Sequence, residues 1–151
     1  MNEITFAGTC LCLLPHLAWL MNPLAAYLVI GLGSALGGVA RYGCGVLAAA
    51  LWPAGFPWMT ILINILGSFV IGLFATLTGP DGRLLVGTRW RQFVMVGICG
   101  GYTTFSAFSL ESVALLRSGR PLAAGANILL SLAFCLLAVW AGHGIARKLN
   151  Q

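Results

Sequence analysis

Long apolar stretches, separated by short polar segments, occupy most of the chain. A run of about 20 apolar residues is long enough to cross a bilayer as a helix. The pattern predicts four membrane-spanning helices, at about residues 24–51, 58–78, 92–116 and 122–146. The intervening segments carry turn-forming glycine and proline, together with interfacial tryptophan and arginine. The expected fold is therefore an all-α integral membrane protein.

Polar residues recur at helical spacing inside two of the predicted spans. Thr60, Asn64 and Gly67 fall on one face of the second span, and Asn127 and Ser131 lie one turn apart in the fourth. A side-chain amide in hydrocarbon needs a partner, either on another helix or in a pore. Helix–helix contact is the commoner role, but the amide NH₂ of Asn64 is also a good anion donor.

The third span contains a stretch, residues 97–111, that does not read as a plain helix. Gly100 and Gly101 weaken a helix, and Thr103 and Thr104 have hydroxyls that compete for backbone partners. These residues predict a break in the middle of the third helix. Broken backbone at that depth is stable only when it is buried in protein or lines a wet cavity. A kink that serves helix packing alone is the alternative.

Aromatic and hydroxyl residues follow the predicted break. Phe105 and Phe108 lie on one side of the helix, and Ser112 continues their line. Ser106 and Ser109 form a second, adjacent line of hydroxyls. Aromatic ring edges are positive, so ring edges beside hydroxyl donors suit a small anion. Ordinary packing is the alternative for the two phenylalanines.

Two charged residues stand within the predicted spans. Arg41 lies in the first span, and Glu111 lies toward the end of the third. Charges at membrane depth mark functional sites by default. The alternatives are that Arg41 reaches the interface near Trp52, and that Glu111 pairs with Arg117 or Arg120.

Composition supports the membrane class. Of 151 residues, 60% are hydrophobic and 7% charged, which excludes an ordinary soluble domain. In this class the net charge of +5 concerns orientation and anionic lipid, and indicates no nucleic-acid partner. The five cysteines show neither a disulfide framework nor zinc spacing, and two isolated histidines predict no His-based metal site.

The basic residues are distributed unevenly between the two membrane sides. Two residues, Arg117 and Arg120, fall on one side, and five fall on the other: Arg83, Arg89, Arg91, Arg147 and Lys148. This bias is weak, so we expect insertion in both orientations. Four glycine-rich helices are few for enclosing a pore, which favours an antiparallel homodimer.

Residues 1–22 form an N-terminal extension in this scheme. The segment has no basic leading region, so it does not resemble a secretory signal. Met21 begins a second plausible start. We therefore interpret residues 1–20 as a mis-assigned start or a dispensable extension, with the four-span domain covering residues 23–148.

Three motifs resemble those of the Fluc (CrcB-type) fluoride channel family. They are Gly37-Gly38-Val-Ala-Arg41-Tyr42, a second-span motif from Thr60 through Asn64 to Gly72, and the third-span sequence Gly97-Ile-Cys-Gly-Gly-Tyr-Thr-Thr-Phe-Ser-Ala-Phe108. The resemblance covers about residues 21–148. Ala107 departs from it, because the family usually has threonine there, and Met59 stands where glycine is common.

The resemblance implies passive, selective fluoride export across the bacterial inner membrane by a dual-topology homodimer with two pores, giving fluoride resistance. It implies a structural sodium ion held by the backbone carbonyls of Gly100 and Thr103 of each copy. It places Arg41 and Glu111 as supporting charges near the pore. The implied pore residues are Asn64, Thr104, Phe105, Ser106, Phe108, Asn127 and Ser131.

Three other classes compete with this interpretation. A small proton-coupled multidrug-type exporter needs a central membrane carboxylate, whereas Asp81 lies in a loop and Glu111 near a span end. A membrane enzyme needs a carboxylate cluster or a nucleophile with its base, and the sequence shows neither, so we expect no enzyme. An inert structural protein does not explain why each span carries polar residues.

Overall fold

The computed structural model describes residues 4–51 and 55–151, with side chains from Pro23 onward. All regular structure in these residues is helical, and four helices are long and apolar enough to cross a membrane: Pro23–Leu51, Trp58–Leu77, Thr88–Arg117 and Pro121–Asn150. The predicted spans are confirmed to within a few residues. The third begins four residues earlier than expected, at Thr88.

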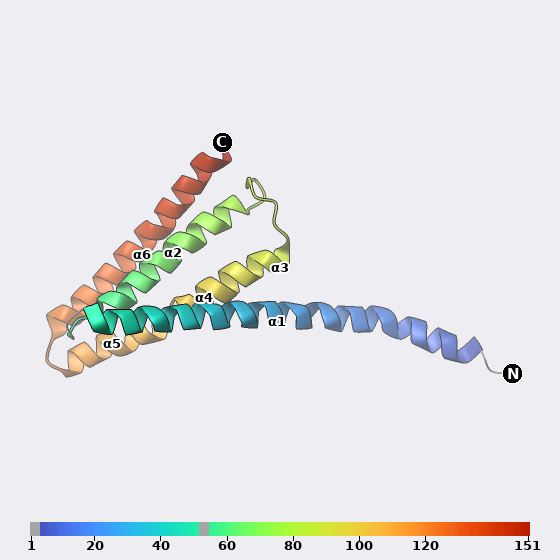
Figure 1. The fold of residues 1–151 in the computed structure, drawn as a ribbon, viewed down its shortest axis with the longest axis horizontal. Helices are drawn as coiled ribbons and strands as arrows, with labels where there is room; N and C mark the ends of the chain where they lie inside the picture. The colour runs from blue at the N-terminus through green and yellow to red at the C-terminus, as the bar shows by residue number, and fades with distance from the viewer. Residues whose placement is uncertain (1–3, 52–54) are drawn as a thin grey trace.

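The first span is the carboxyl-terminal part of α1, which runs without interruption from Ile4 to Leu51. At 1.5 Å per residue this helix is about 72 Å long, well beyond the hydrocarbon thickness. Figure 1 shows α1 projecting far past the other helices at its N-terminal end. Residues 4–22 of the predicted extension continue this helix, and residues 1–3 lie outside the described ones.

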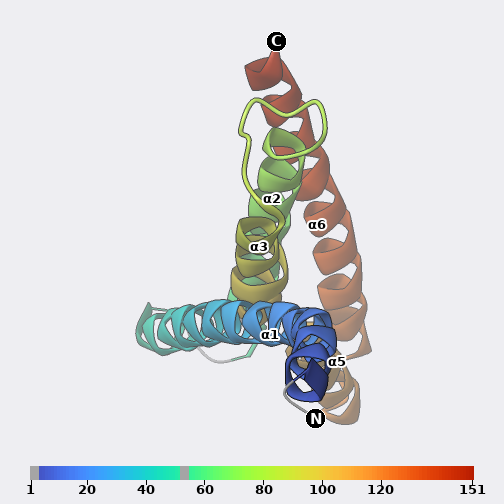
Figure 2. The same ribbon diagram turned by 90° about the vertical axis from the view of Figure 1, so that its right-hand side faces the viewer.

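The second and fourth spans, α2 (Trp58–Leu77) and α6 (Pro121–Asn150), lie side by side in parallel (Figures 1 and 2). Glycine permits their close approach. A Cβ atom added to Gly72 would collide with the Val139 carbonyl, and one added to Gly142 would collide with the Phe69 carbonyl. The backbones therefore pack in direct contact, as small residues allow in membrane proteins.

The third span is assembled from four consecutive pieces. They are α3 (Thr88–Arg91), the π-helix η1 (Gln92–Cys99), α4 (Gly100–Tyr102) and α5 (Phe105–Arg117). Its first half packs along α1, where a Cβ on Gly33 would lie 2.6 Å from the Phe93 carbonyl oxygen. Its second half packs on α6. The third span thus joins α1 to the α2–α6 pair.

Arginine hydrogen bonds hold the connecting segments at both ends of the molecule. At the α3 end, which comprises residues 78–91 and 147–151, the Arg83 side chain donates to the carbonyl of Leu149, and the Arg83 backbone N–H donates to Asn150 Oδ1. At the α5 end, residues 55–57 and 117–121, Arg120 donates to the carbonyl of Gly55. The Arg83 contacts tie the segment after α2 to the end of α6, and the Arg120 contact joins the two connecting segments of the α5 end.

Candidate functional site

The third helix is broken at Thr103 and Thr104. Both residues have extended backbone, with φ/ψ of −76°/158° and −151°/114°, between helices that end at Tyr102 and begin again at Phe105. The predicted mid-span break is confirmed. Gly100 and Gly101 remain helical, so the two threonines and their neighbours carry the change of direction.

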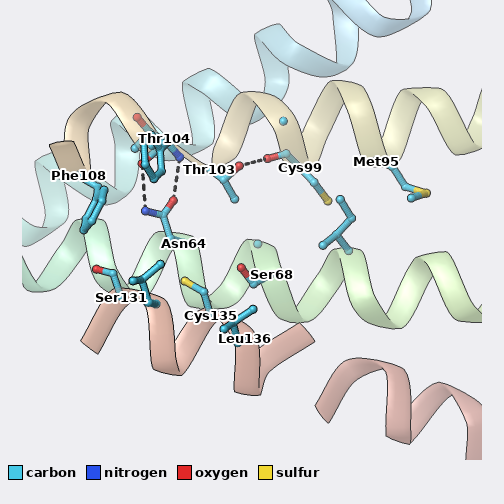
Figure 3. A pocket seen from close by; sticks show the side chains of 15 residues that line it. Asn64, Ser68, Met95, Cys99, Thr103, Thr104, Phe108, Ser131, Cys135 and Leu136 are labelled. Carbon is cyan, nitrogen blue, oxygen red and sulfur yellow. Dashed lines mark hydrogen bonds between the residues drawn. The ribbon is translucent and has the colours of Figure 1, made fainter. Parts of the chain in front are cut away.

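The Asn64 side chain of α2 hydrogen-bonds the backbone groups of Thr104, which lose their helical partners at the break. Its Nδ2 donates to the Thr104 carbonyl at 3.1 Å, and its Oδ1 accepts from the Thr104 N–H at 2.8 Å (Figure 3). The amide therefore pairs with one residue as a neighbouring peptide would. Of the two partners expected for the Asn64 amide, another helix or a pore, the structure shows the first, and the second N–H of the amide remains for another acceptor.

Thr104 also caps the second half of the span. Its Oγ1 accepts from the Ala107 N–H at 3.1 Å and shares a hydrogen bond with Ser106 Oγ at 3.2 Å. In an unbroken helix, the Thr104 and Ala107 N–H groups would donate to the carbonyls of Gly100 and Thr103. Here Asn64 and the Thr104 side chain take those N–H groups instead, which releases both carbonyls.

The two phenylalanines form a tilted pair directly after the break. Their ring centroids are 5.3 Å apart with an interplanar angle of 48°. Phe108 is buried, whereas Phe105 is 75% exposed in the single chain. The prediction that both rings share one face is confirmed, and the exposed ring marks a surface that one chain leaves uncovered.

A cavity of about 370 Å³ lies beside the break, between α2, the third span and α6. Asn64, Thr103, Thr104, both phenylalanines and Ser131 line it, so the structure brings these predicted residues together. Other residues of its wall were not predicted from the sequence, among them Ser68, Cys99 and Cys135. Ser68 and Cys135 lie one helical turn after Asn64 and Ser131, a spacing that extends each predicted polar face.

The polar residues of α6 continue toward the α5 end. Asn127 is completely buried, and its Nδ2 donates to Ser112 Oγ at 2.9 Å, which in turn donates to the Phe108 carbonyl at 2.8 Å. Neither Asn127 Oδ1 nor Ser131 Oγ has a hydrogen-bond partner in the described part of the chain. Buried polar atoms are rarely left unpaired, so these two atoms mark places for a ligand or water.

The two charged residues within the spans take different positions. Glu111 Oε1 accepts from Thr60 Oγ1 at 2.7 Å, while Oε2 has no partner among residues 4–51 and 55–151. The expected pairing with Arg117 or Arg120 is therefore not formed, because Glu111 faces α2 and Arg120 binds the Gly55 carbonyl. Arg41 is half-exposed on α1.

Comparisons with a family model and with related proteins point to the same family. The family described as "CrcB-like protein, Camphor Resistance (CrcB)" matches residues 28–143. A Rhodospirillum rubrum protein named fluoride-specific ion channel FluC is 54% identical over 125 residues, which cover 83% of this chain and 97% of the relative. An Opitutus terrae protein of the same name is 52% identical over 128 residues, covering 85% and 97%. The chain therefore belongs to the CrcB family, the family of the Fluc fluoride channels.

Proposed function

We propose that this protein is a fluoride-selective passive channel of the bacterial membrane that exports cytoplasmic fluoride and lowers its toxicity. The observation that carries the proposal is the cavity beside the broken third helix, in a chain whose relatives bear that function in their names. Fluoride is small and strongly hydrated, so a selective pathway must replace its water with donors. The cavity offers such donors without a lysine or arginine that would hold the ion too firmly.

The donors in this pathway are neutral. They are the second N–H of Asn64, the unpartnered hydroxyl of Ser131, the hydroxyl of Ser106, and the positive edges of the Phe105 and Phe108 rings. Thr104 contributes indirectly, because its side chain and backbone hold Ser106 and Asn64. Each donor binds the anion weakly enough for rapid release.

The pathway toward Asn127 and Glu111 has a different character. The unpartnered atoms there, Asn127 Oδ1 and Glu111 Oε2, accept hydrogen bonds and repel a bare anion. Bound water that donates to them presents its other hydrogen to fluoride. We therefore place the fully desolvated ion beside the phenylalanines and a partly hydrated ion near Asn127.

The working unit in this proposal is an antiparallel homodimer with two pathways, one copy inserted in each orientation. The 75% exposure of Phe105 supports it, because a second copy would cover that ring and close the open side of the cavity. Arg41 is assigned to the entrance, where its charge attracts anions from water.

A structural sodium ion fits the released carbonyls of Gly100 and Thr103. Hard cations prefer oxygen ligands, and both carbonyls lose their helical N–H partners at the break. The ion would supply positive potential and hold the two copies together. Replacing sodium with a large organic cation during purification should lower the dimer's melting temperature; an unchanged value would remove sodium from the proposal.

Fluoride efflux from liposomes tests the function. The purified protein is reconstituted with internal fluoride, valinomycin supplies the counter-current, and a fluoride electrode follows release, with chloride measured in parallel. Fast fluoride efflux without chloride efflux is the expected result. A well-folded protein that releases neither ion, or both at similar rates, would contradict it. The structure does not favour the proton-coupled exporter, since Glu111 binds Thr60 near the end of the span.

A further inference from the structure

A second cleft opens at the α3 end, away from the cavity beside the break. It has a volume of about 820 Å³ and lies between Pro23 and Ala26 of α1 and the start of the third span. The residues that line it on the third span are Gly87, Thr88, Arg89, Trp90 and Gln92. None of the proposed fluoride-binding side chains contributes to it.

The crossing of α1 with the third span creates this cleft. The two helices touch through backbone at Gly33, which faces Phe93 and Gly97. From that contact they diverge toward the α3 end, as Figure 1 shows. The wedge between the diverging helices therefore leaves the apolar residues Pro23 and Ala26 of α1 facing a largely polar start of the third span.

The chemistry around the wedge matches the membrane interface. Trp90 is 64% exposed, and its ring is fixed edge-on against Phe93 with centroids 5.6 Å apart. Leu24 and Tyr27 on α1 are also largely exposed beside it. Tryptophan and tyrosine with neighbouring leucine are typical of the level where headgroups meet acyl chains.

The charge of the α3 end indicates which kind of molecule would occupy the wedge. Five basic side chains belong to the α3 end, Arg83, Arg89, Arg91, Arg147 and Lys148, against one acidic side chain, Asp81, among the described residues of that end. Basic clusters at the end of a membrane span attract anionic lipid. We propose that the wedge binds one anionic phospholipid, with its headgroup phosphate near Thr88 and Arg89 and an acyl chain against α1.

Lipid retention measured by native mass spectrometry tests this site without measuring ion flux. The full chain is purified and titrated with palmitoyl-oleoyl phosphatidylglycerol, with the matching phosphatidylcholine, and with inorganic phosphate alone. We expect phosphatidylglycerol to bind at least about fivefold more tightly than phosphatidylcholine, and phosphate alone to bind negligibly. Equal affinity for the two lipids, or binding of phosphate alone, would overturn the proposal.

Three variants locate the binding. Arg89→Gln should weaken phosphatidylglycerol binding about fivefold. Ala26→Trp should also weaken it, because the indole fills the wedge while every charge is kept. Arg117→Gln, at the α5 end, should leave it unchanged. If a second copy of the chain fills the wedge instead, neither Arg89→Gln nor Ala26→Trp will alter lipid binding, and the proposal fails.

Discussion

At the scale of single residues, the double hydrogen bond between Asn64 and Thr104 combines a structural and a functional role. Asn64→Ala leaves the N–H and the carbonyl of Thr104 unpaired. Each buried unpaired group costs about 1–3 kcal/mol. We expect a lower melting temperature and at least a tenfold slower fluoride efflux, measured on the same preparation.

Asn150 provides the matched control for this variant. It too holds backbone groups with both ends of its amide, accepting from the Arg83 N–H at 2.9 Å and donating to the Thr76 carbonyl at 3.2 Å. It lies at the α3 end, outside the cavity. Asn150→Ala should lower stability with little effect on efflux. Equal loss of efflux in both variants would assign the Asn64 effect to stability alone.

Ser131 and Ser112 separate binding from packing. The Ser131 hydroxyl is buried without a partner among the residues that the structure describes, whereas the Ser112 hydroxyl bonds both Asn127 and the Phe108 carbonyl. Ser131→Ala should keep or slightly raise the free energy of unfolding while slowing efflux about tenfold. Ser112→Ala should lower that free energy by about 1–3 kcal/mol. A Ser131→Ala protein that is as destabilised as Ser112→Ala would show that Ser131 is a packing residue.

At the scale of helices, α2 and α6 are in direct backbone contact at glycine residues. Gly142 faces the Phe69 carbonyl with no room for a methyl group, whereas Gly144 has open space around its Cα. Gly142→Ala should destabilise the protein by about 1–3 kcal/mol through overpacking. Gly144→Ala should be neutral or stabilising by up to about 1 kcal/mol, because alanine favours a helix. Thermal unfolding followed by tryptophan fluorescence compares the two, and equal melting temperatures would contradict this packing.

The helices themselves were largely predictable from the sequence. Uninterrupted apolar runs place the spans, and adjacent Gly and Thr residues predict the break, because both signals are local. The π-helix from Gln92 to Cys99 was not predictable, since its sequence is as apolar as that of an ordinary helix. The partner of Glu111 was also missed. Nearby arginines suggested an ion pair, but the carboxylate instead accepts a hydrogen bond from Thr60, 51 positions away.

In the candidate site too, features that depend on nearby residues were predictable, whereas contacts between residues far apart in the sequence were not. Helical spacing predicts that Phe105 and Phe108 share a face and that Asn127 and Ser131 form a polar stripe, and both are confirmed. Spacing does not say that Asn64 pairs with Thr104 rather than with another helix residue. That contact depends on how α2 lies against the third span, where Gly67 makes room for the Thr103 methyl group.

At the scale of the whole molecule, the uneven charge between the ends makes orientation testable. Lowering the charge of the α5 end with Arg117→Ser should favour insertion with the α3 end in the cytoplasm. Arg147→Ser and Lys148→Ser combined with Ser118→Lys and Leu122→Lys leave three basic residues at the α3 end against four at the α5 end, and should favour the opposite orientation. Both sets change exposed residues at the helix ends and leave the cavity intact.

An antiparallel homodimer needs both orientations in one membrane. We therefore expect each orientation-biased protein, expressed alone in a fluoride-sensitive bacterium, to give little fluoride resistance, and the two expressed together to restore it. Growth on fluoride measures the outcome, and protease cleavage of a C-terminal tag from one side checks each orientation. Full resistance from a uniformly oriented protein would show that a pathway forms between copies of the same orientation, or within one chain. If the pathway lies within one chain, the exposed Phe105 ring faces lipid, and its replacement by leucine should leave efflux unchanged.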